Sequence, residues 1–310
     1  MKERKSFKIG ITSGDPFGIG PEIILKSLIF FEKNKLNFII YGDSIFFEKI
    51  SRDLKIKFPS NVFIKDVYRI KEMPKSHPSK EGGKYAYESL LSAIYDIKNR
   101  EINALITSPL SKKGIELNGI EFKGHTEFLA KEFRISEEDV LMTFISNKIK
   151  IALLTTHIPL KDVYKYLKED FIERKINALL NFYKRFYKKI PEIAFLSLNP
   201  HKGENGEEER ILEKILKKFD FIKGIYPSDS FFMKNFYKEF DFIFAIYHDQ
   251  GLIPFKIISK GKGCNLTMGL PFLRVSPCHG PAYDIAFKNV ADINSMVFSI
   301  KFLISLLKFF

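Results

Sequence analysis

The chain has 310 residues, 45% of them hydrophobic, which is long enough for two packed domains. Its formal net charge of +13 comes from 50 basic residues interleaved with 37 acidic ones, without a basic tail or zinc-finger spacing, so we expect no nucleic-acid partner. The two cysteines, Cys264 and Cys278, are too few for a disulfide framework and do not form a CxxC pair.

Apolar runs that end in Gly, Pro or Asp alternate along the chain with segments of helical spacing. The expected strands lie within residues 7–15, 37–43, 103–109, 150–157, 192–200 and 241–249. The expected helices lie within residues 21–33, 85–99, 160–186 and 207–219. This alternation predicts an α/β fold with a mainly parallel sheet that is covered on both faces. We expect a first domain of residues 1–123 and 285–310 and a second domain of residues 124–284.

Neither end of the chain resembles a membrane segment. No uninterrupted apolar stretch follows the basic N-terminus before Gly14, so a signal peptide is not expected. The apolar residues 296–310 are interrupted by Lys301 and Lys308, which favours a buried terminal helix over a membrane span. These features predict a cytoplasmic protein.

Five of the six histidines lie in short blocks rich in Gly, Pro, Asn and Asp. They are His125, His157, His201, His248 and His279. His157, His201 and His248 each follow a predicted strand directly, so we expect these three histidines near one edge of the sheet. Three imidazoles can hold a zinc, cobalt, manganese or magnesium ion and leave coordination positions open for substrate. The alternative is three separate histidines, each hydrogen-bonded in its own turn.

Other polar residues leave several interpretations open. The glycine-rich stretch at 12–22 is either a tight turn or a set of backbone amides that face a ligand. Asp249 could orient His248, bind a metal or cap a helix. Lys256 and Arg274 suit phosphate or carboxylate recognition, although for Lys256 taken alone an ordinary surface charge is the favoured explanation.

Eight blocks in order resemble one known family. The blocks are ITSGDPFGIGPE, ITSPLSK, GHTEFLA, TTHIPLKDV, LNPHKGENG, YHDQGLIPFK, CNLTMGLPFLR and CHGPAYDIA. Their order resembles the 4-hydroxythreonine-4-phosphate dehydrogenase family of bacterial pyridoxal phosphate biosynthesis, from about residue 8 to about residue 292. The resemblance implies a homodimer with an isocitrate/isopropylmalate dehydrogenase-like fold. Each subunit has two α/β domains, and the active site lies in the cleft at the dimer interface.

The resemblance also implies a reaction and a set of site residues. The family oxidises 4-phosphooxy-L-threonine with NAD or NADP, and the β-keto acid then loses carbon dioxide to give 3-amino-2-oxopropyl phosphate. By position, the metal ligands are His157, His201 and His248, drawn in the family from both subunits. The matching substrate contacts are His125, Thr126, Lys256, Asn265 and Arg274.

These positions suggest how the chemistry is divided. We hypothesise that Arg274, Lys256 and His125 hold the anionic groups of a small phosphorylated substrate. A divalent ion polarises the hydroxyl, and Asp249 or a metal-bound water assists removal of the proton. Asp249 and Lys256 are therefore the candidate catalytic residues.

The block CHGPAYDIA resembles the loop around the cofactor adenosine in isopropylmalate-type dehydrogenases. His279, Gly280 and Asp284 are accordingly candidate cofactor contacts. The chain departs from the family pattern here, because Cys278 stands where Asp is usual and Pro281 where Thr is usual, and Phe287 and Asn289 replace glycines.

Two other functions remain open. One is a related metal-dependent decarboxylating dehydrogenase that acts on another hydroxy acid or on a dihydrodiol. The other is an enzyme similar to the phosphate acyltransferases, which share the wider fold and need neither a nicotinamide nor a three-histidine site.

Overall fold

The computed structural model describes residues 7–33, 36–71, 76–201 and 206–309. The chain forms two units: Met1–Glu132 together with Pro271–Lys308, and Phe133–Leu270. Each unit is built around its own part of a β-sheet, with helices packed on it.

The observed boundaries differ from the predicted ones at 123 and 284. Strand β11 (Leu273–Pro277) pairs in parallel with β4 (Ala104–Thr107), which places it in the first unit. The ring of Phe128 packs on Tyr87 of the first unit, with 5.7 Å between ring centroids. Consequently the GHTEF block, Arg274 and the CHGPAYD loop all belong to the first unit.

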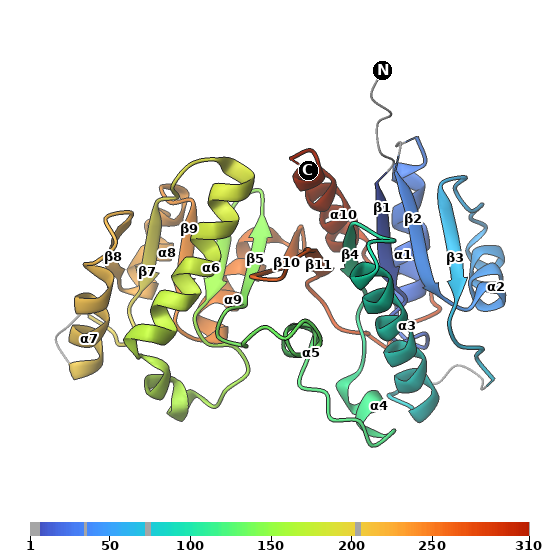
Figure 1. Cartoon of the computed structure of the whole chain (residues 1–310), viewed down its shortest axis with the longest axis horizontal. Coiled ribbons are helices and arrows are strands. Elements are labelled where there is room, and N and C mark those ends of the chain that lie inside the picture. The colour runs from blue at the N-terminus through green and yellow to red at the C-terminus, as the bar shows by residue number, and fades with distance from the viewer. Residues whose placement is uncertain (1–6, 34–35, 72–75, 202–205, 310) are drawn as a thin grey trace. The chain divides into compact units, whose positions relative to one another are not determined.

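The first unit contains a parallel sheet in the strand order β3-β2-β1-β4-β11. Its other strands are β1 (Lys8–Thr12), β2 (Asn37–Gly42) and β3 (Val62–Asp66). Its helices are α1 (Gly20–Leu28), η1 (Ile29–Phe31), α2 (Ser44–Leu54), α3 (Lys80–Lys98), α4 (Lys112–Glu116), α5 (His125–Glu132) and α10 (Asn294–Leu307). Helix α3 packs on β1, β2 and β4, whereas α10 packs on β11 and α1 (Figure 1).

The second unit contains strands in the order β10-β5-β6-β9-β7-β8. They are β5 (Leu141–Ser146), β6 (Lys150–Leu153), β7 (Ile193–Leu196), β8 (Ile222–Tyr226), β9 (Phe242–Ala245) and β10 (Gly263–Met268). Its helices are η2 (Leu160–Tyr166), α6 (Glu169–Tyr187), α7 (Glu207–Leu216), α8 (Ser228–Met233), η3 (Phe236–Lys238) and α9 (His248–Ser259). Strand β5 is antiparallel to both β10 and β6, and the strands from β6 to β8 are parallel.

The predicted α/β fold is confirmed, with one difference in a helix. The helix expected at 160–186 is divided into η2 and α6, because Leu167 and Lys168 leave the helical backbone conformation between them. The terminal helix α10 forms as predicted and buries Met296, Ile300 and Leu303. Within the described ranges, no helix combines the length and apolar character that crossing a membrane requires.

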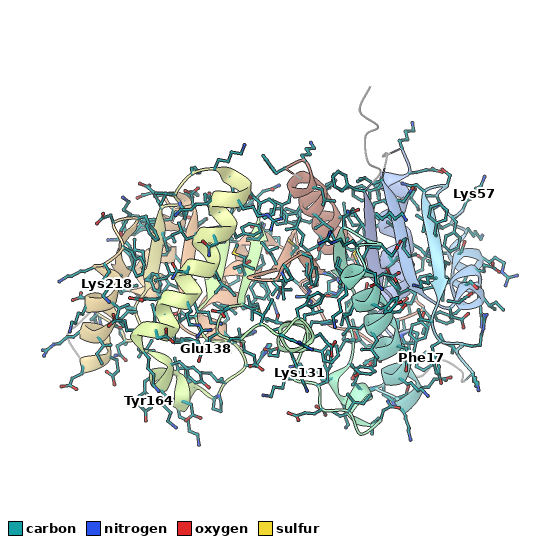
Figure 2. All side chains as sticks on the ribbon, in the orientation of Figure 1. Phe17, Lys57, Lys131, Glu138, Tyr164 and Lys218 are labelled. Atoms are coloured by element: carbon teal, nitrogen blue, oxygen red, sulfur yellow. The ribbon has the colours of Figure 1, made fainter. Side chains whose placement is uncertain are left out.

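Lysine side chains are distributed over both units. Figure 2 shows Lys57 and Lys131 on the first unit and Lys218 on the second, and all three are exposed. Basic residues also form surface ion pairs, such as Arg174 with Asp139 at 2.7 Å. Exposed lysines therefore occur on both units.

Candidate functional site

Three adjacent parallel strands lead to three of the histidines. Strand β9 pairs in parallel with β6 on one side and with β7 on the other. His157 follows β6, His248 follows β9 and His201 follows β7. The carboxyl ends of adjacent parallel strands lie at the same edge of a sheet, which is where ligands bind in open α/β sheets. The strands before the three histidines therefore end at one edge of the sheet.

Two of these histidines lie close together. The ring centroids of His157 and His248 are 5.8 Å apart, and the rings are tilted by 41°. Two imidazoles that share one ion, with metal–nitrogen distances of about 2.0–2.1 Å, have centroids roughly 5–6 Å apart. The pair therefore fits a common divalent ion.

Asp249 orients the ring of His248. Its Oδ1 lies 2.8 Å from His248 Nδ1, so the proton on that nitrogen can be donated to the carboxylate. This arrangement directs Nε2 away from the carboxylate and leaves it for a metal, as is typical of carboxylate–histidine pairs around metal ions. Of the three roles considered for Asp249, the geometry favours that of orienting His248.

His201 has an unusual backbone conformation. Its φ is 57°, in the left-handed region, and its side chain is exposed. Residues 202–205 of its block lie outside the described residues. Within the described part of this one chain, no group of three or more His, Cys, Asp or Glu side chains could hold a metal ion. The three-histidine site stays a prediction, and the resemblance takes its ligands from two subunits.

Arg274 and His125 form a buried polar cluster in the first unit. Arg274 is only 2% exposed, and its Nε and Nη2 donate to Thr107 Oγ1 at 3.0 and 2.5 Å. The ring of His125 packs edge-on against Phe122. Burial, together with the positive charges of Arg274 and Lys112, holds the pKa of His125 well below its ordinary value, so its imidazole is neutral at pH 7.

This cluster is suited to an anionic ligand. His125 Nε2 is buried without a hydrogen-bond partner among the described residues, and so is the Oγ of Ser108, the residue after Thr107 in the sequence. Buried polar atoms usually have partners, so the unpaired His125 Nε2 close to the buried Arg274 guanidinium suggests that a ligand supplies the missing bond. Sequence reasoning did not identify Thr107 or Ser108. Their place at the end of β4, in the ITSP run, is the signal that could have found them.

The remaining predicted substrate residues occupy different elements. Thr126 is buried in the first turn of α5. Asn265 is buried on β10, where it pairs with Phe144 of β5. Lys256 is exposed in the last turn of α9, the helix that begins with His248. Thr126 lies in the first unit, whereas Asn265 and Lys256 lie in the second.

The glycine-rich turn after β1 uses its amides within the protein. The amide of Asp15 donates to the Pro109 carbonyl at 2.9 Å, and that of Ile19 donates to the Pro281 carbonyl at 2.8 Å. The amides of Phe17 and Gly18 donate to the Asp15 side chain and carbonyl, respectively. These bonds favour the tight-turn interpretation over a ligand-binding one.

The CHGPAYD loop is anchored to this turn. The hydroxyl of Tyr283 donates to Asp15 Oδ2 at 2.6 Å, next to the bond between Ile19 and Pro281. Asp15 is almost fully buried. Burial raises the pKa of its carboxyl above the ordinary value, and the hydrogen bonds from Tyr283 and the Phe17 amide partly oppose this rise.

The raised pKa of Asp15 predicts a specific pH dependence of stability. The folded state binds the Asp15 proton more tightly than the unfolded state, whose carboxyl has a pKa of about 3.9. The free energy of unfolding therefore loses a contribution as pH rises from about 4 through the raised pKa. Asp15→Asn removes this dependence, so its stability relative to the wild type should increase across that window and then level off. Urea titrations from pH 4 to 8 measure the difference, and a flat difference curve would contradict it.

The candidate cofactor residues lie on the same loop. Gly280 and Asp284 are exposed, and a Cβ added at Gly280 would meet no atom within 4 Å. His279 Nε2 is buried and has no hydrogen-bond partner within the described ranges. A ligand that supplies an acceptor or a donor there would complete the bonding of this imidazole.

The departures at Phe287 and Asn289 have a structural consequence. Both residues adopt left-handed conformations, with φ of 62° and 61°. Glycine enters this region without steric cost, whereas a residue such as Phe pays roughly 1–2 kcal/mol. This explains why glycine suits both positions. The loop keeps the conformation through anchors such as the bond from Lys26 Nζ to the Asn289 carbonyl at 3.0 Å.

Comparisons with known proteins agree in naming one family. The model of the family described as "Pyridoxal phosphate biosynthetic protein PdxA" matches residues 27–303. A 4-hydroxythreonine-4-phosphate dehydrogenase from Hydrogenobaculum sp. is 38% identical over 307 residues, covering 95% of this chain and 97% of that protein. A D-threonate 4-phosphate dehydrogenase from Pectobacterium atrosepticum is 34% identical over 318 residues, covering 94% of this chain and 97% of that protein.

Solved structures agree with these sequence matches. The crystal structure of 4-hydroxythreonine-4-phosphate dehydrogenase from Klebsiella pneumoniae has a TM-score of 0.80 and 30% identity, covering 97% of this chain and 99% of that chain. An isocitrate dehydrogenase from Methylococcus capsulatus has a TM-score of 0.51 and 14% identity, covering 97% of this chain and 86% of that chain. The latter likeness concerns the fold alone and agrees with the predicted isocitrate dehydrogenase-like architecture.

Proposed function

Because this chain belongs to the PdxA family of 4-hydroxythreonine-4-phosphate dehydrogenases, we propose that it oxidises 4-phosphooxy-L-threonine with NAD or NADP. Loss of carbon dioxide from the resulting β-keto acid then gives 3-amino-2-oxopropyl phosphate, a step of pyridoxal phosphate biosynthesis. The related proteins are dehydrogenases, and the chain is accordingly an oxidoreductase. The observation that carries the proposal is the His157–His248 pair at the ends of two adjacent parallel strands.

The substrate's anionic groups are assigned to the buried cluster of the first unit, and the resemblance adds Lys256 and Asn265 as further contacts. Arg274 presents a planar set of donors that suits a phosphate or carboxylate, and His125 contributes a neutral imidazole. Lys256 adds a positive charge from α9. Thr126 and Asn265 supply uncharged polar groups that orient the substrate.

The histidines at the sheet edge are assigned to a divalent ion. His157, His201 and His248 would hold it, and when bound it supplies Lewis-acid stabilisation of negative charge on the substrate oxygen. Asp249 keeps the imidazole of His248 in the required tautomer through Oδ1, and its other carboxylate oxygen can take the hydroxyl proton.

The nicotinamide cofactor is assigned to the loop that contains His279, Gly280 and Asp284. The exposed glycine allows close approach of a ligand, and Asp284 is available to accept hydrogen bonds from ribose hydroxyls. When bound in this loop, the cofactor would supply the acceptor for the hydride that leaves the substrate's carbinol carbon.

We further assign a homodimer to this function. Ile253 and Ile257 are one turn apart on α9 and are 59% and 68% exposed. They lie on the helix that contains both His248 and Lys256, so a second copy that covers them would also reach the proposed site. Large exposed apolar side chains of this kind are typical of subunit contacts.

Replacing Ile253 and Ile257 by aspartate should therefore yield a monomer with little activity. Burying two charges at a subunit contact is strongly unfavourable. Analytical ultracentrifugation measures the change in mass, and a dehydrogenase assay measures the loss of turnover. Ile211→Asp is the matched control, because Ile211 is 46% exposed on α7 of the same unit. A double variant that remains dimeric would exclude this helix from the interface.

One assay tests the proposed activity. Purified protein with a divalent metal, NAD or NADP and 4-phosphooxy-L-threonine should produce reduced nicotinamide and carbon dioxide. D-threonate 4-phosphate is the comparison substrate, because a relative with 34% identity is named for it. Turnover of that substrate alone would overturn the substrate assignment but keep the dehydrogenase. Phosphate-dependent acyl transfer without nicotinamide would overturn both.

A further inference from the structure

A buried glutamine joins the strand ends that lead to the histidines. Gln250 is 8% exposed and lies in the first turn of α9, two residues after His248. Its Oε1 accepts a hydrogen bond from the Ile246 amide at 2.6 Å. Its Nε2 donates to the Ser197 carbonyl at 2.6 Å and to Ser228 Oγ at 2.8 Å. The side chain thus uses both its acceptor and its donor group inside the protein.

Gln250 joins the two chain segments beyond the last paired residues of β7 and β9. The pairing of β7 with β9 runs as far as Phe195 and Phe244. Ser197 and Ile246 each lie two residues beyond that last pair, on the segments that continue to His201 and His248. The Gln250 side chain therefore supplies hydrogen bonds where the next backbone pair of β7 and β9 would lie, and it holds the two segments at a fixed separation.

The segment that leads to His157 is hydrogen-bonded to Ile246 as well. The amide and the Oγ1 of Thr155 donate to the Ile246 carbonyl at 3.1 and 2.6 Å. Ile246 thus receives Thr155 on its carbonyl and Gln250 on its amide. All three histidine segments are tied together through the backbone groups of this one residue.

We propose that Gln250 is a positioning residue that sets the spacing of the histidines for a shared divalent ion. The inference rests on the proposed function and adds a residue to it. Only an amide side chain satisfies the two backbone groups at once, because Ile246 offers a donor and Ser197 offers an acceptor. A glutamate of the same shape would face the Ser197 carbonyl with a second acceptor, and a leucine would leave both backbone groups unpaired.

The test compares Gln250→Glu and Gln250→Leu with two milder variants. Ser228→Ala removes only the hydroxyl partner of Gln250 and leaves its two backbone bonds. Thr155→Val removes the Oγ1 bond to Ile246 and leaves the amide bond. For each full-length protein, Co²⁺ affinity is measured by competition with a chelator, the Co²⁺ absorption spectrum is recorded, and the melting temperature is measured without metal.

We expect Gln250→Glu and Gln250→Leu to lower Co²⁺ affinity by about 10- to 100-fold and to alter the Co²⁺ spectrum, as loss of a supporting partner around a metal site typically does. Ser228→Ala should stay close to the wild type. A lower melting temperature with unchanged Co²⁺ affinity and spectrum would show that Gln250 only stabilises the fold and would overturn the inference. If wild-type Co²⁺ binding does not depend on His157 or His248, the proposed metal site itself is wrong, and the inference fails with it.

Discussion

Replacing His248 by alanine is expected to lower kcat/KM for 4-phosphooxy-L-threonine by at least about a thousandfold. Metal ions contribute several kcal/mol of transition-state stabilisation, and each 1.36 kcal/mol is about tenfold in rate. His248 has the central position, because its strand β9 lies between β6 and β7 and its ring is 5.8 Å from that of His157. Steady-state kinetics with added metal measure the loss of kcat/KM, and metal analysis of the purified variant measures the loss of bound metal.

The same experiment separates a metal ligand from a structural histidine. His157→Ala should lose metal and activity together with His248→Ala, whereas His77→Ala should lose neither, because His77 is exposed and lies outside the histidine blocks. Treatment of the wild type with a chelator should reproduce the loss, and added metal should restore it. Full activity of both alanine variants after metal stripping would make the metal assignment wrong.

The sequence predicted the histidine edge because that signal is local. Each of the apolar runs before His157, His201 and His248 is recognisable as a strand from its own residues. That β9 lies between β6 and β7 is not contained in any one run, since pairing joins residues almost a hundred positions apart. The parallel part of the sheet was therefore predictable, whereas its strand order was not.

The role of Gln250 could not be predicted for a related reason. A glutamine in the run HDQG has the composition of a surface helix start, and Gly251 and Pro254 obscure the helix that follows. Its burial depends on Ser197 and Ser228, which come from different parts of the second unit. The grouping of residues 271–284 with the first unit depends in a similar way on a contact between distant segments, the pairing of β11 with β4.

The resemblance and the geometry also contribute differently to the candidate site. The resemblance supplied His125 and Arg274 as substrate residues. The structure adds that both are buried in the first unit, and that burial and neighbouring charges favour the neutral imidazole. A buried guanidinium close enough to lower the pKa of His125, whose Nε2 has no partner among the described residues, is an arrangement suited to an anionic ligand. It leads to a prediction in which ligand binding and stability are measured separately.

Replacing Arg274 by methionine is expected to lower kcat/KM by roughly 30-fold to several-thousand-fold, because losing one partner of a buried charge pair costs about 2–5 kcal/mol. Arg274→Lys should also be impaired. A lysine ammonium keeps the charge but cannot reproduce the two bonds to Thr107 while presenting a planar face to an anion. Kinetics with 4-phosphooxy-L-threonine measure the loss of kcat/KM. Calorimetric titration with inorganic phosphate measures the loss of phosphate affinity.

The melting temperature of the ligand-free protein distinguishes a binding role from a structural one. Arg274→Met removes both donors to Thr107 Oγ1, so its melting temperature should fall modestly, whereas its affinity for phosphate should fall strongly. Arg52→Met is the control, because Arg52 is exposed on α2 of the same unit and should alter neither property. A large fall in the melting temperature with unchanged phosphate affinity would show that Arg274 stabilises the sheet through its hydrogen bonds to Thr107. The unpaired His125 Nε2 would then need a different ligand.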